Sequence, residues 1–176
     1  MNIFDSAADR LLIVAHRGSS AGNIPCNAMA AYKAALAQGA DMIEVDANMS
    51  ADGTLYSFHP KMESRHLGVD LSIPDLRDTE VQALRYLNTD RVPTQFGIPT
   101  LEEIFELCDR ITILRDGQYI DTKYIKDITM DDVVQMMIGR EIGERYPERD
   151  VKLGDVIFEV KDLNCPGVFE NVNFTV

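Results

Sequence analysis

The sequence predicts an α/β fold for residues 1–100 and a small α+β segment for residues 101–176. Two observations carry this prediction. In the first half, short apolar runs flank an alanine-rich stretch, which is the strand–helix–strand order of a parallel sheet. In the second half, an Asp-Gly turn separates two apolar runs, as in a β-hairpin. We therefore expect a domain boundary near residue 100.

The first strand and helix are predicted within residues 11–39. Leu11–Ala15 is apolar throughout, as a buried parallel strand is, and His-Arg-Gly follows from residue 16. Asn27 is a suitable N-cap residue for an alanine-rich helix over Ala28–Gln38. Gly39 is expected to end that helix, because glycine adopts the left-handed backbone conformation at little cost.

Two further strands are predicted over Met42–Ala47 and Thr54–His59. A Ser-Ala-Asp-Gly turn separates them. Residues 60–99 contain several prolines and are expected to be mostly loop, with a helix around Asp78–Leu84.

The second half of the chain carries helix caps and turn residues at regular intervals. Thr100 and Glu103 form a Thr-x-x-Glu capping box, and Gly139 is expected to end a later helix. Residues 141–152 are highly charged and are expected to be a connector. The predicted elements are a helix over Leu101–Cys108, a hairpin of Ile111–Leu114 with Tyr119–Thr122, a helix from Thr129 through Ile138, and antiparallel strands at Val156–Val160 and Val168–Val176.

Composition limits the partners and the location of the protein. The formal net charge is −12, which argues against a nucleic acid or an anionic membrane surface as the main partner. No apolar run is long enough to span a membrane, and the first residues do not resemble a signal peptide. Three widely spaced cysteines suggest reduced thiols. We expect a cytoplasmic protein.

Polar side chains follow the predicted strands of the first half. Glu44 and Asp46 are two residues apart, so on a strand they point to the same face. Two adjacent carboxylates would repel each other there, and a divalent cation would relieve the repulsion. The alternative is a pair of carboxylates exposed to water beside a turn.

Histidines stand after two of the apolar runs, at His16 and His59. Active sites of parallel α/β folds lie at the carboxyl ends of strands, and imidazoles titrate near neutral pH, so an acid/base pair is one interpretation. Arg17 beside Gly18 could bind a phosphate group. The alternative is that each histidine is structural; His66 is expected in a surface loop.

These residues belong to a series of motifs that resembles the glycerophosphodiester phosphodiesterase family over about residues 10–101. Members of that family are (β/α)8 barrels, and the first half would supply the first three βα units of an incomplete TIM-barrel-like fold. The motifs are Val14-Ala-His-Arg-Gly18, Pro25-Cys-Asn-Ala28, Gly39-Ala-Asp-Met-Ile-Glu-Val-Asp46, Ser50-Ala-Asp-Gly53 and Phe58-His59.

The resemblance implies a hydrolase of lipid metabolism that cleaves glycerophosphodiesters to glycerol 3-phosphate and an alcohol with a divalent cation, Mg²⁺ or Ca²⁺. It assigns His16 and His59 as the acid/base pair, Arg17 as a phosphate ligand, and Glu44 and Asp46 as metal ligands. The chain departs from the family pattern in two places. The common Pro-Glu-Asn-Thr is Pro-Cys-Asn-Ala here, and the usual His-Asp is His-Pro.

The second half is similar to another kind of protein, the ATP-binding subunit of bacterial sugar importers of the ABC class. It resembles the end of the first nucleotide-binding domain and the start of the second. No Gly-x-x-x-x-Gly-Lys-Ser/Thr loop occurs in the sequence, so we expect no nucleotide binding. The similar stretches are Leu101 through Gly117, Met136 through Glu141, Tyr146-Pro147 and Phe158 through Leu163.

The two resemblances overlap at residues 101–103, which suggests a fusion at that point. Three interpretations follow from the sequence. The chain is an enzyme that hydrolyses a small-molecule glycerophosphodiester, alone or through self-association of its incomplete barrel. It is an inactive, non-catalytic remnant of a fusion. Or it is an interaction fragment related to a sugar importer.

Overall fold

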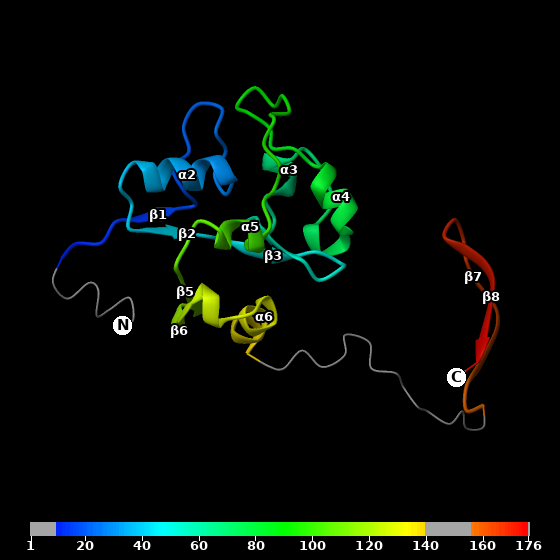
Figure 1. Cartoon of the computed structure of the whole chain (residues 1–176). Helices are drawn as coiled ribbons and strands as arrows, with labels where there is room; N and C mark the ends of the chain where they lie inside the picture. The colour runs from blue at the N-terminus through cyan, green and yellow to red at the C-terminus, as the bar shows by residue number, and fades with distance from the viewer. Residues whose placement is uncertain (1–9, 140–155, 176) are drawn as a thin grey trace. The chain divides into compact units, whose positions relative to one another are not determined.

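A parallel pair of short strands organises the first part of the chain in the computed structural model, which describes residues 10–139 and 156–175 (Figure 1). β1 (Val14–His16) pairs with β2 (Met42–Glu44), so that His16 lies opposite Glu44. α2 (Met29–Ala37) connects the two strands. The predicted strand–helix–strand unit is confirmed, with elements shorter than expected.

The prediction of one strand over Met42–Ala47 and of a third parallel strand was wrong. The strand breaks after Glu44, and β3 (Ala47–Met49) pairs antiparallel with β4 (Leu55–Ser57). The turn between β3 and β4 is closed by a hydrogen bond from Ser50 N to Thr54 O of 2.9 Å. A turn this short can join only antiparallel strands, because a parallel connection needs a crossover of a dozen or more residues.

Residues 60–99 contain short helices around a buried core. They are α3 (Glu63–His66), a 3₁₀ turn at Ile73–Asp75 and α4 (Asp78–Ala83), of which α4 confirms the predicted helix. A cluster of buried side chains holds this region against β4. Its members are Ala28, Tyr56, Phe58, Leu67, Ile73, Leu76, Val81, Tyr86 and Ile98.

The helices and the hairpin predicted after residue 100 are present. Capping boxes begin α5 (Leu101–Phe105) and α6 (Met130–Ile138), with Thr100 and Thr129 at the N-caps. Gly139 ends α6 in the left-handed conformation, with φ of 78°. β5 (Arg110–Arg115) and β6 (Gln118–Tyr124) form the hairpin around Asp-Gly.

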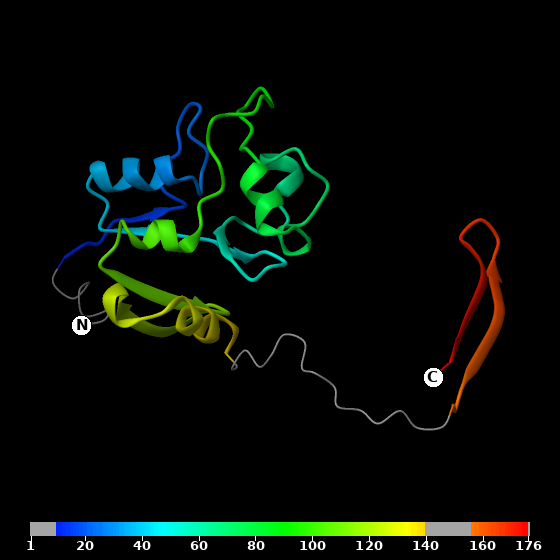
Figure 2. The same ribbon diagram turned by 45° about the vertical axis from the view of Figure 1, so that its right-hand side comes forward.

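A second buried cluster joins elements from both sides of residue 100. It unites Tyr32, Leu55, Leu101, Ile104, Ile113, Val133 and Val134. Figure 2 shows α2 on one side of β1 and β2, with β5, β6 and α6 on the other. The first compact unit accordingly runs through Met1–Glu141, and the chain's second unit is Ile142–Val176. Residue 100 is therefore not a boundary between compact units, because α5, β5 and α6 bury apolar side chains against the first half.

The second unit contains an antiparallel hairpin of β7 (Glu159–Cys165) and β8 (Phe169–Thr175). The two predicted antiparallel strands are thus present, with β7 beginning later than expected. The charged connector over residues 141–152 lies outside the described residues. Many large apolar side chains of this hairpin region are exposed, namely Val156, Ile157, Phe158, Leu163, Val168, Phe169 and Phe174.

The described residues form an α/β structure with four two-stranded sheets and no closed barrel. In these same parts of the chain, no helix has the length and apolar character that a membrane crossing requires.

Candidate active site

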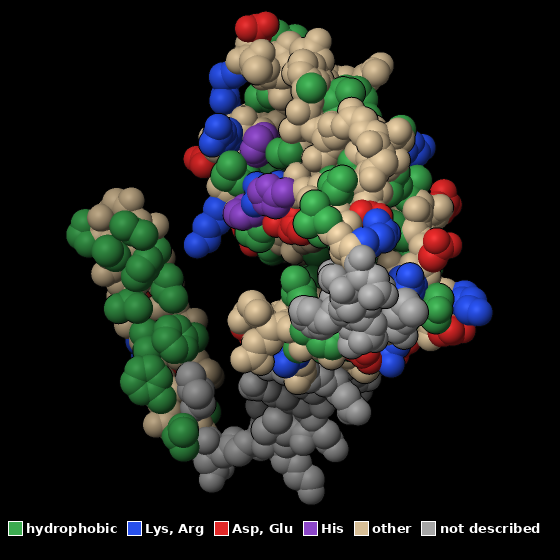
Figure 3. Space-filling model, turned by 90° about the vertical axis from the view of Figure 1, so that its left-hand side faces the viewer, with side chains coloured by type: hydrophobic (Ala, Val, Ile, Leu, Met, Phe, Trp, Pro, Cys, Tyr) green, Lys and Arg blue, Asp and Glu red, His purple; other side chains and the backbone are tan. Residues whose placement is uncertain are grey.

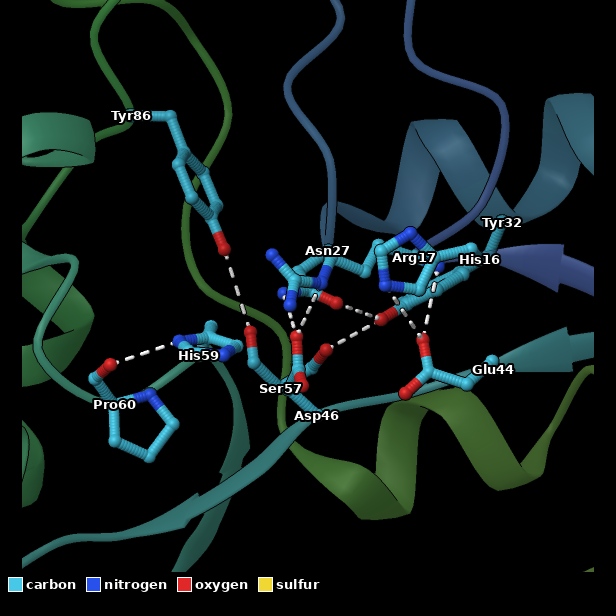
Figure 4. A network of polar contacts seen from close by, with 10 residues as sticks. All are labelled: His16, Arg17, Asn27, Tyr32, Glu44, Asp46, Ser57, His59, Pro60 and Tyr86. Carbon is cyan, nitrogen blue, oxygen red and sulfur yellow. Dashed lines mark hydrogen bonds and ion pairs between the residues drawn. The ribbon is translucent and has the colours of Figure 1, made fainter.

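The carboxyl ends of β1 and β2 bring three of the predicted site residues together. His16 is the last residue of β1 and Glu44 the last of β2, and the two are partners in the parallel register. His16 Nε2 lies 3.9 Å from Glu44 Oε2. Arg17 is the residue after His16, and the close-up in Figure 4 shows the side chains of His16, Arg17 and Glu44 near one another. The predicted placement at strand ends is therefore what the structure contains.

Arg17 connects both predicted carboxylates. Its backbone N–H donates to Glu44, at 3.1 Å from the carbonyl oxygen and 3.2 Å from Oε2. Its guanidinium Nε lies 2.8 Å from Asp46 Oδ2, as an ion pair without hydrogen-bond geometry. Only 21% of the Arg17 side chain and 17% of the Asp46 side chain are exposed, so water screens this pair less than a surface pair.

The loop that carries Arg17 adopts an unusual backbone. Arg17 has φ of 57°, a left-handed conformation that costs a non-glycine residue of the order of 1–3 kcal/mol. Gly18 follows with φ of 80°, and a Cβ atom there would lie 2.6 Å from the backbone carbon of Ala31. Ser19 N then donates to Ala31 O at 2.9 Å. The loop is thus packed directly on α2, and only glycine fits at position 18.

Asn27 holds the other side of this loop. The prediction that it caps the helix was wrong, because the N-cap is Ala28 and Asn27 itself is left-handed, with φ of 60°. Its backbone N–H donates to Arg17 O at 3.0 Å, and its Nδ2 donates to Asp46 Oδ2 at 2.9 Å. Asn27 is only 2% exposed. Sequence reasoning missed this role, although the Pro-x-Asn motif is a signal that could have indicated it.

Two buried hydroxyl groups lie behind Asn27. Tyr32 Oη donates to Asn27 Oδ1 at 2.9 Å and lies 2.6 Å from Ser57 Oγ. Burial raises the pKa of the Tyr32 phenol well above its usual value. A further tyrosine, Tyr86, donates from its hydroxyl to Ser57 O at 3.3 Å. These residues were not predicted to belong to the site.

His59 is the predicted site residue that the polar contacts do not reach. Its Nδ1 pairs with the carbonyl oxygen of Pro60 at 2.8 Å. Among the described residues, no hydrogen bond or ion pair links it to His16, Arg17 or the two carboxylates. His59 nevertheless follows Ser57 by two residues, and Figure 4 shows it on the opposite side of Asp46 from His16.

The prediction that His66 lies in a surface loop was wrong. It ends α3 and is partly buried, with its ring against the Phe58 ring at a centroid distance of 6.4 Å. Burial lowers the pKa of His66, and the positive charges of Arg65 and Arg17 add to this effect. Figure 3 shows histidine side chains gathered on one face of the first unit, beside charged side chains.

The two carboxylates each have one oxygen available as a ligand for a divalent cation. Asp46 Oδ2 and Glu44 Oε2 are engaged by Arg17, Asn27 and His16, whereas no hydrogen bond or ion pair in the described residues reaches Asp46 Oδ1 or Glu44 Oε1. Across residues 10–139 and 156–175, no group of three or more His, Cys, Asp or Glu could hold a metal. The donor set fits a cation as two of its six or more oxygen ligands.

The sequence model of the Glycerophosphoryl diester phosphodiesterase family matches residues 16–163. The chain belongs to this family. The resemblance on which the sequence prediction rested is therefore confirmed. A solved relative supports the fold as well: a glycerophosphoryl diester phosphodiesterase from Parabacteroides distasonis is 28% identical, with a TM-score of 0.52. That match covers 57% of this chain and 36% of the relative.

The second resemblance is also confirmed. The ribose import ATP-binding protein RbsA of Bacillus cereus is 47% identical over 105 residues, which cover 57% of this chain and 21% of the relative. RbsA of Bacillus subtilis is 54% identical over 76 residues, or 43% of this chain and 15% of the relative. This member of the phosphodiesterase family is thus a chimera that also contains sequence of the importer subunit, of which it spans about a fifth.

Proposed function

We propose that this chain catalyses the hydrolysis of glycerophosphodiesters to glycerol 3-phosphate and an alcohol, with the help of a divalent cation. The observation that carries the proposal is the pairing of His16 with Glu44 at the carboxyl ends of β1 and β2, with Arg17 bound to both Glu44 and Asp46. This arrangement supports the proposal, because a proton-transfer group, a phosphate-binding group and two cation ligands would then lie within one site.

Arg17 would bind the substrate phosphate. Its Nε is held by Asp46, which leaves the Nη groups to donate to phosphoryl oxygens. The negative charge that develops on those oxygens in the transition state is stabilised by this fixed cation. Asp46 therefore orients the guanidinium as well as serving as a cation ligand.

His16 and His59 would transfer the protons. One imidazole accepts the proton of the attacking hydroxyl group, and the other donates a proton to the leaving alkoxide oxygen. The His16 side chain is 73% exposed, so substrate can reach it from solvent. A cation held by Glu44 and Asp46, either Mg²⁺ or Ca²⁺, would supply further stabilisation of the phosphoryl oxygens when it is bound.

A direct assay tests this function. The purified full chain is incubated with glycerophosphocholine and Mg²⁺ or Ca²⁺, and released glycerol 3-phosphate is measured with and without EDTA. We expect release that EDTA suppresses. A chain that is folded and monodisperse but releases no glycerol 3-phosphate under any of these conditions would contradict the proposal.

A non-catalytic role is the second candidate, and two observations favour it. The described residues contain no closed barrel, and apolar side chains of the β7–β8 hairpin are exposed. An interaction fragment of a sugar importer, without ATP binding, would present such a surface to a partner. This candidate predicts co-purification with importer subunits, and the co-purification should be lost when residues 101–176 are deleted. Self-association of the incomplete barrel would instead give oligomers whose size depends on protein concentration.

We propose that the chimera joins residues 1–100 of phosphodiesterase origin to residues 101–176 of importer origin. The Leu-Glu-Glu at residues 101–103 is common to both sequence patterns and supports a join there. Long-read sequencing across the locus tests this origin. Two separate genes with no junction between them would contradict it. The cytoplasm is the proposed location.

A further inference from the structure

A chain of buried hydrogen bonds runs behind the site from β4 to Asp46 (Figure 4). Ser57 Oγ lies 2.6 Å from Tyr32 Oη, Tyr32 Oη lies 2.9 Å from Asn27 Oδ1, and Asn27 Nδ2 lies 2.9 Å from Asp46 Oδ2. The chain thereby connects the strand that precedes His59 with the carboxylate that holds Arg17.

The chemistry of each group fixes the direction of every hydrogen bond in this chain. Asn27 must present its amide nitrogen to the Asp46 carboxylate, because a carboxylate only accepts, and its Oδ1 therefore accepts from Tyr32. Tyr32 has one hydroxyl proton, which is used in that bond. Ser57 must then donate to Tyr32 Oη. All donors point toward Asp46, so the bonds polarise one another in the same direction.

Water cannot replace any of the three neutral members. Tyr32 and Ser57 have no exposed surface, and Asn27 is 2% exposed. A phenol is protonated at neutral pH, and burial raises the pKa of Tyr32 further, so its hydroxyl remains a donor. Removal of the Tyr32 hydroxyl would leave Asn27 Oδ1 buried without its hydrogen bond, so the amide would be held on the Asp46 side alone.

Asn27 is the point at which this chain acts on the site. It binds Asp46 through its side chain and Arg17 O through its backbone N–H, at 3.0 Å. Asp46 Oδ2 receives both Asn27 Nδ2 and the guanidinium of Arg17. The orientation of the Asn27 amide therefore fixes where the Asp46 carboxylate, and with it the Arg17 fork, can lie.

We propose that Tyr32 is a positioning residue that acts through Asn27 and Asp46 to hold the Arg17 guanidinium ready for a phosphate group. This inference rests on the proposed function in its assignment of Arg17. Tyr32 itself is buried and does not touch substrate. Its contribution is a hydrogen bond to Asn27 Oδ1, which holds the Asn27 amide in the orientation that the Asp46 carboxylate requires.

The experiment compares Tyr32→Phe with Tyr86→Phe in the full chain. Both substitutions delete a buried tyrosine hydroxyl that forms a hydrogen bond with Ser57. The Tyr86 hydroxyl donates to the backbone carbonyl of Ser57, and among the described residues no hydrogen bond joins it to Asn27. Two properties are measured: the side-chain amide resonances of Asn27 by ¹H–¹⁵N NMR, and the affinity for glycerol 3-phosphate by calorimetry. Urea unfolding reports the stability of each variant.

We expect Tyr32→Phe to shift the Asn27 side-chain resonances and to weaken binding of glycerol 3-phosphate about three- to tenfold, the effect of one buried hydrogen bond. Tyr86→Phe is expected to leave the Asn27 resonances in place and the affinity within about twofold, since its hydroxyl lies outside the directed chain. Equal effects of the two substitutions, or unchanged Asn27 resonances in Tyr32→Phe, would overturn the proposal.

Ser57→Ala keeps the test decisive if Tyr32→Phe fails to fold. It removes the donor to Tyr32 and leaves the ring in place, so a smaller shift of the same Asn27 resonances is expected. No shift in that variant would overturn the proposal as well. If the wild-type chain binds no glycerol 3-phosphate, the proposed function fails, while the Asn27 resonances still decide whether Tyr32 positions Asn27.

Discussion

The guanidinium Nε of Arg17 lies 2.8 Å from Asp46 Oδ2, and both side chains are largely buried. Arginine presents its donors as a planar fork, and the ion pair with Asp46 restrains where that fork lies. The same Asp46 oxygen accepts a hydrogen bond from Asn27. The arginine that we propose as the phosphate ligand is thus held in place by Asp46, which Asn27 holds in turn.

Arg17→Lys tests the importance of this fork. Lysine keeps the positive charge but cannot bind Asp46 and a phosphate group with the same planar geometry. We expect the affinity for glycerol 3-phosphate to fall about tenfold, measured by calorimetry. Lys33→Ala, a substitution on the exposed side of α2, is the control and should leave the affinity unchanged. Wild-type affinity in Arg17→Lys would show that the fork plays no part.

Gly18→Ala is expected to destabilise the first unit. The new Cβ would meet the Ala31 backbone at 2.6 Å, and the residue would keep a φ of 80°. Strain and overpacking together should lower the free energy of unfolding by about 2–5 kcal/mol, measured by urea unfolding. Gly22→Ala is the matched control, since Gly22 has φ of 59° and no atom within 4 Å of the new Cβ. Equal losses in both variants would contradict close packing of the Gly18 loop on α2.

His66 should make the stability of the protein depend on pH. Burial depresses its folded pKa below the ordinary value of 6.5, and the charges of Arg65, Arg17 and His59 act in the same direction. Its unfolded form therefore binds a proton first as the pH falls. The contribution of neutral His66 to the free energy of unfolding is fully present above pH 6.5. It declines as the pH falls from there through the folded pKa, and below that it levels off.

The substitution His66→Gln removes this titration. We expect a flatter profile of unfolding free energy below pH 6.5 than in the wild type, measured by urea unfolding at each pH. Parallel profiles for the two proteins would show that His66 is not responsible.

Truncation distinguishes the end of the first compact unit, at residue 141, from the proposed junction of the two sequence origins at residue 100. Residues 1–141 keep the buried cluster that joins Tyr32 and Leu55 to Ile104 and Val133, whereas residues 1–100 lose it. We expect cooperative thermal unfolding of the longer fragment and its loss in the shorter one, followed by circular dichroism. Cooperative unfolding of residues 1–100 alone would contradict a core shared across residue 100.

Local signals in the sequence predicted much of this structure. The capping box at Thr100 and the helix that begins after Thr129 were predicted from residues within one turn, and both are present. The neighbouring parallel strands that carry His16 and Glu44 followed from the strand–helix–strand order, and their pairing was confirmed. In these cases the physical cause lies within a few residues or within one supersecondary unit.

Other features were missed. The antiparallel pairing of β3 with β4 could have been predicted, because the turn between them is too short to join parallel strands. Asn27 was assigned as a cap because the same residue type also tolerates left-handed backbone and binds carboxylates. Tyr32 resembled an ordinary core residue of an alanine-rich helix, and only the fold shows what its hydroxyl meets.

The central claim is that His16 and His59 transfer protons during hydrolysis. Turnover by variants of the histidines tests it most directly. Release of glycerol 3-phosphate from glycerophosphocholine is measured for the wild type, His16→Ala, His59→Ala and His66→Gln in the presence of the cation. We predict at least a hundredfold loss of kcat in the first two variants, about the contribution of one acid or base, and near wild-type turnover in His66→Gln. Hydrolysis that survives in both His16→Ala and His59→Ala, or its absence in the wild type, would contradict a catalytic site at these strand ends.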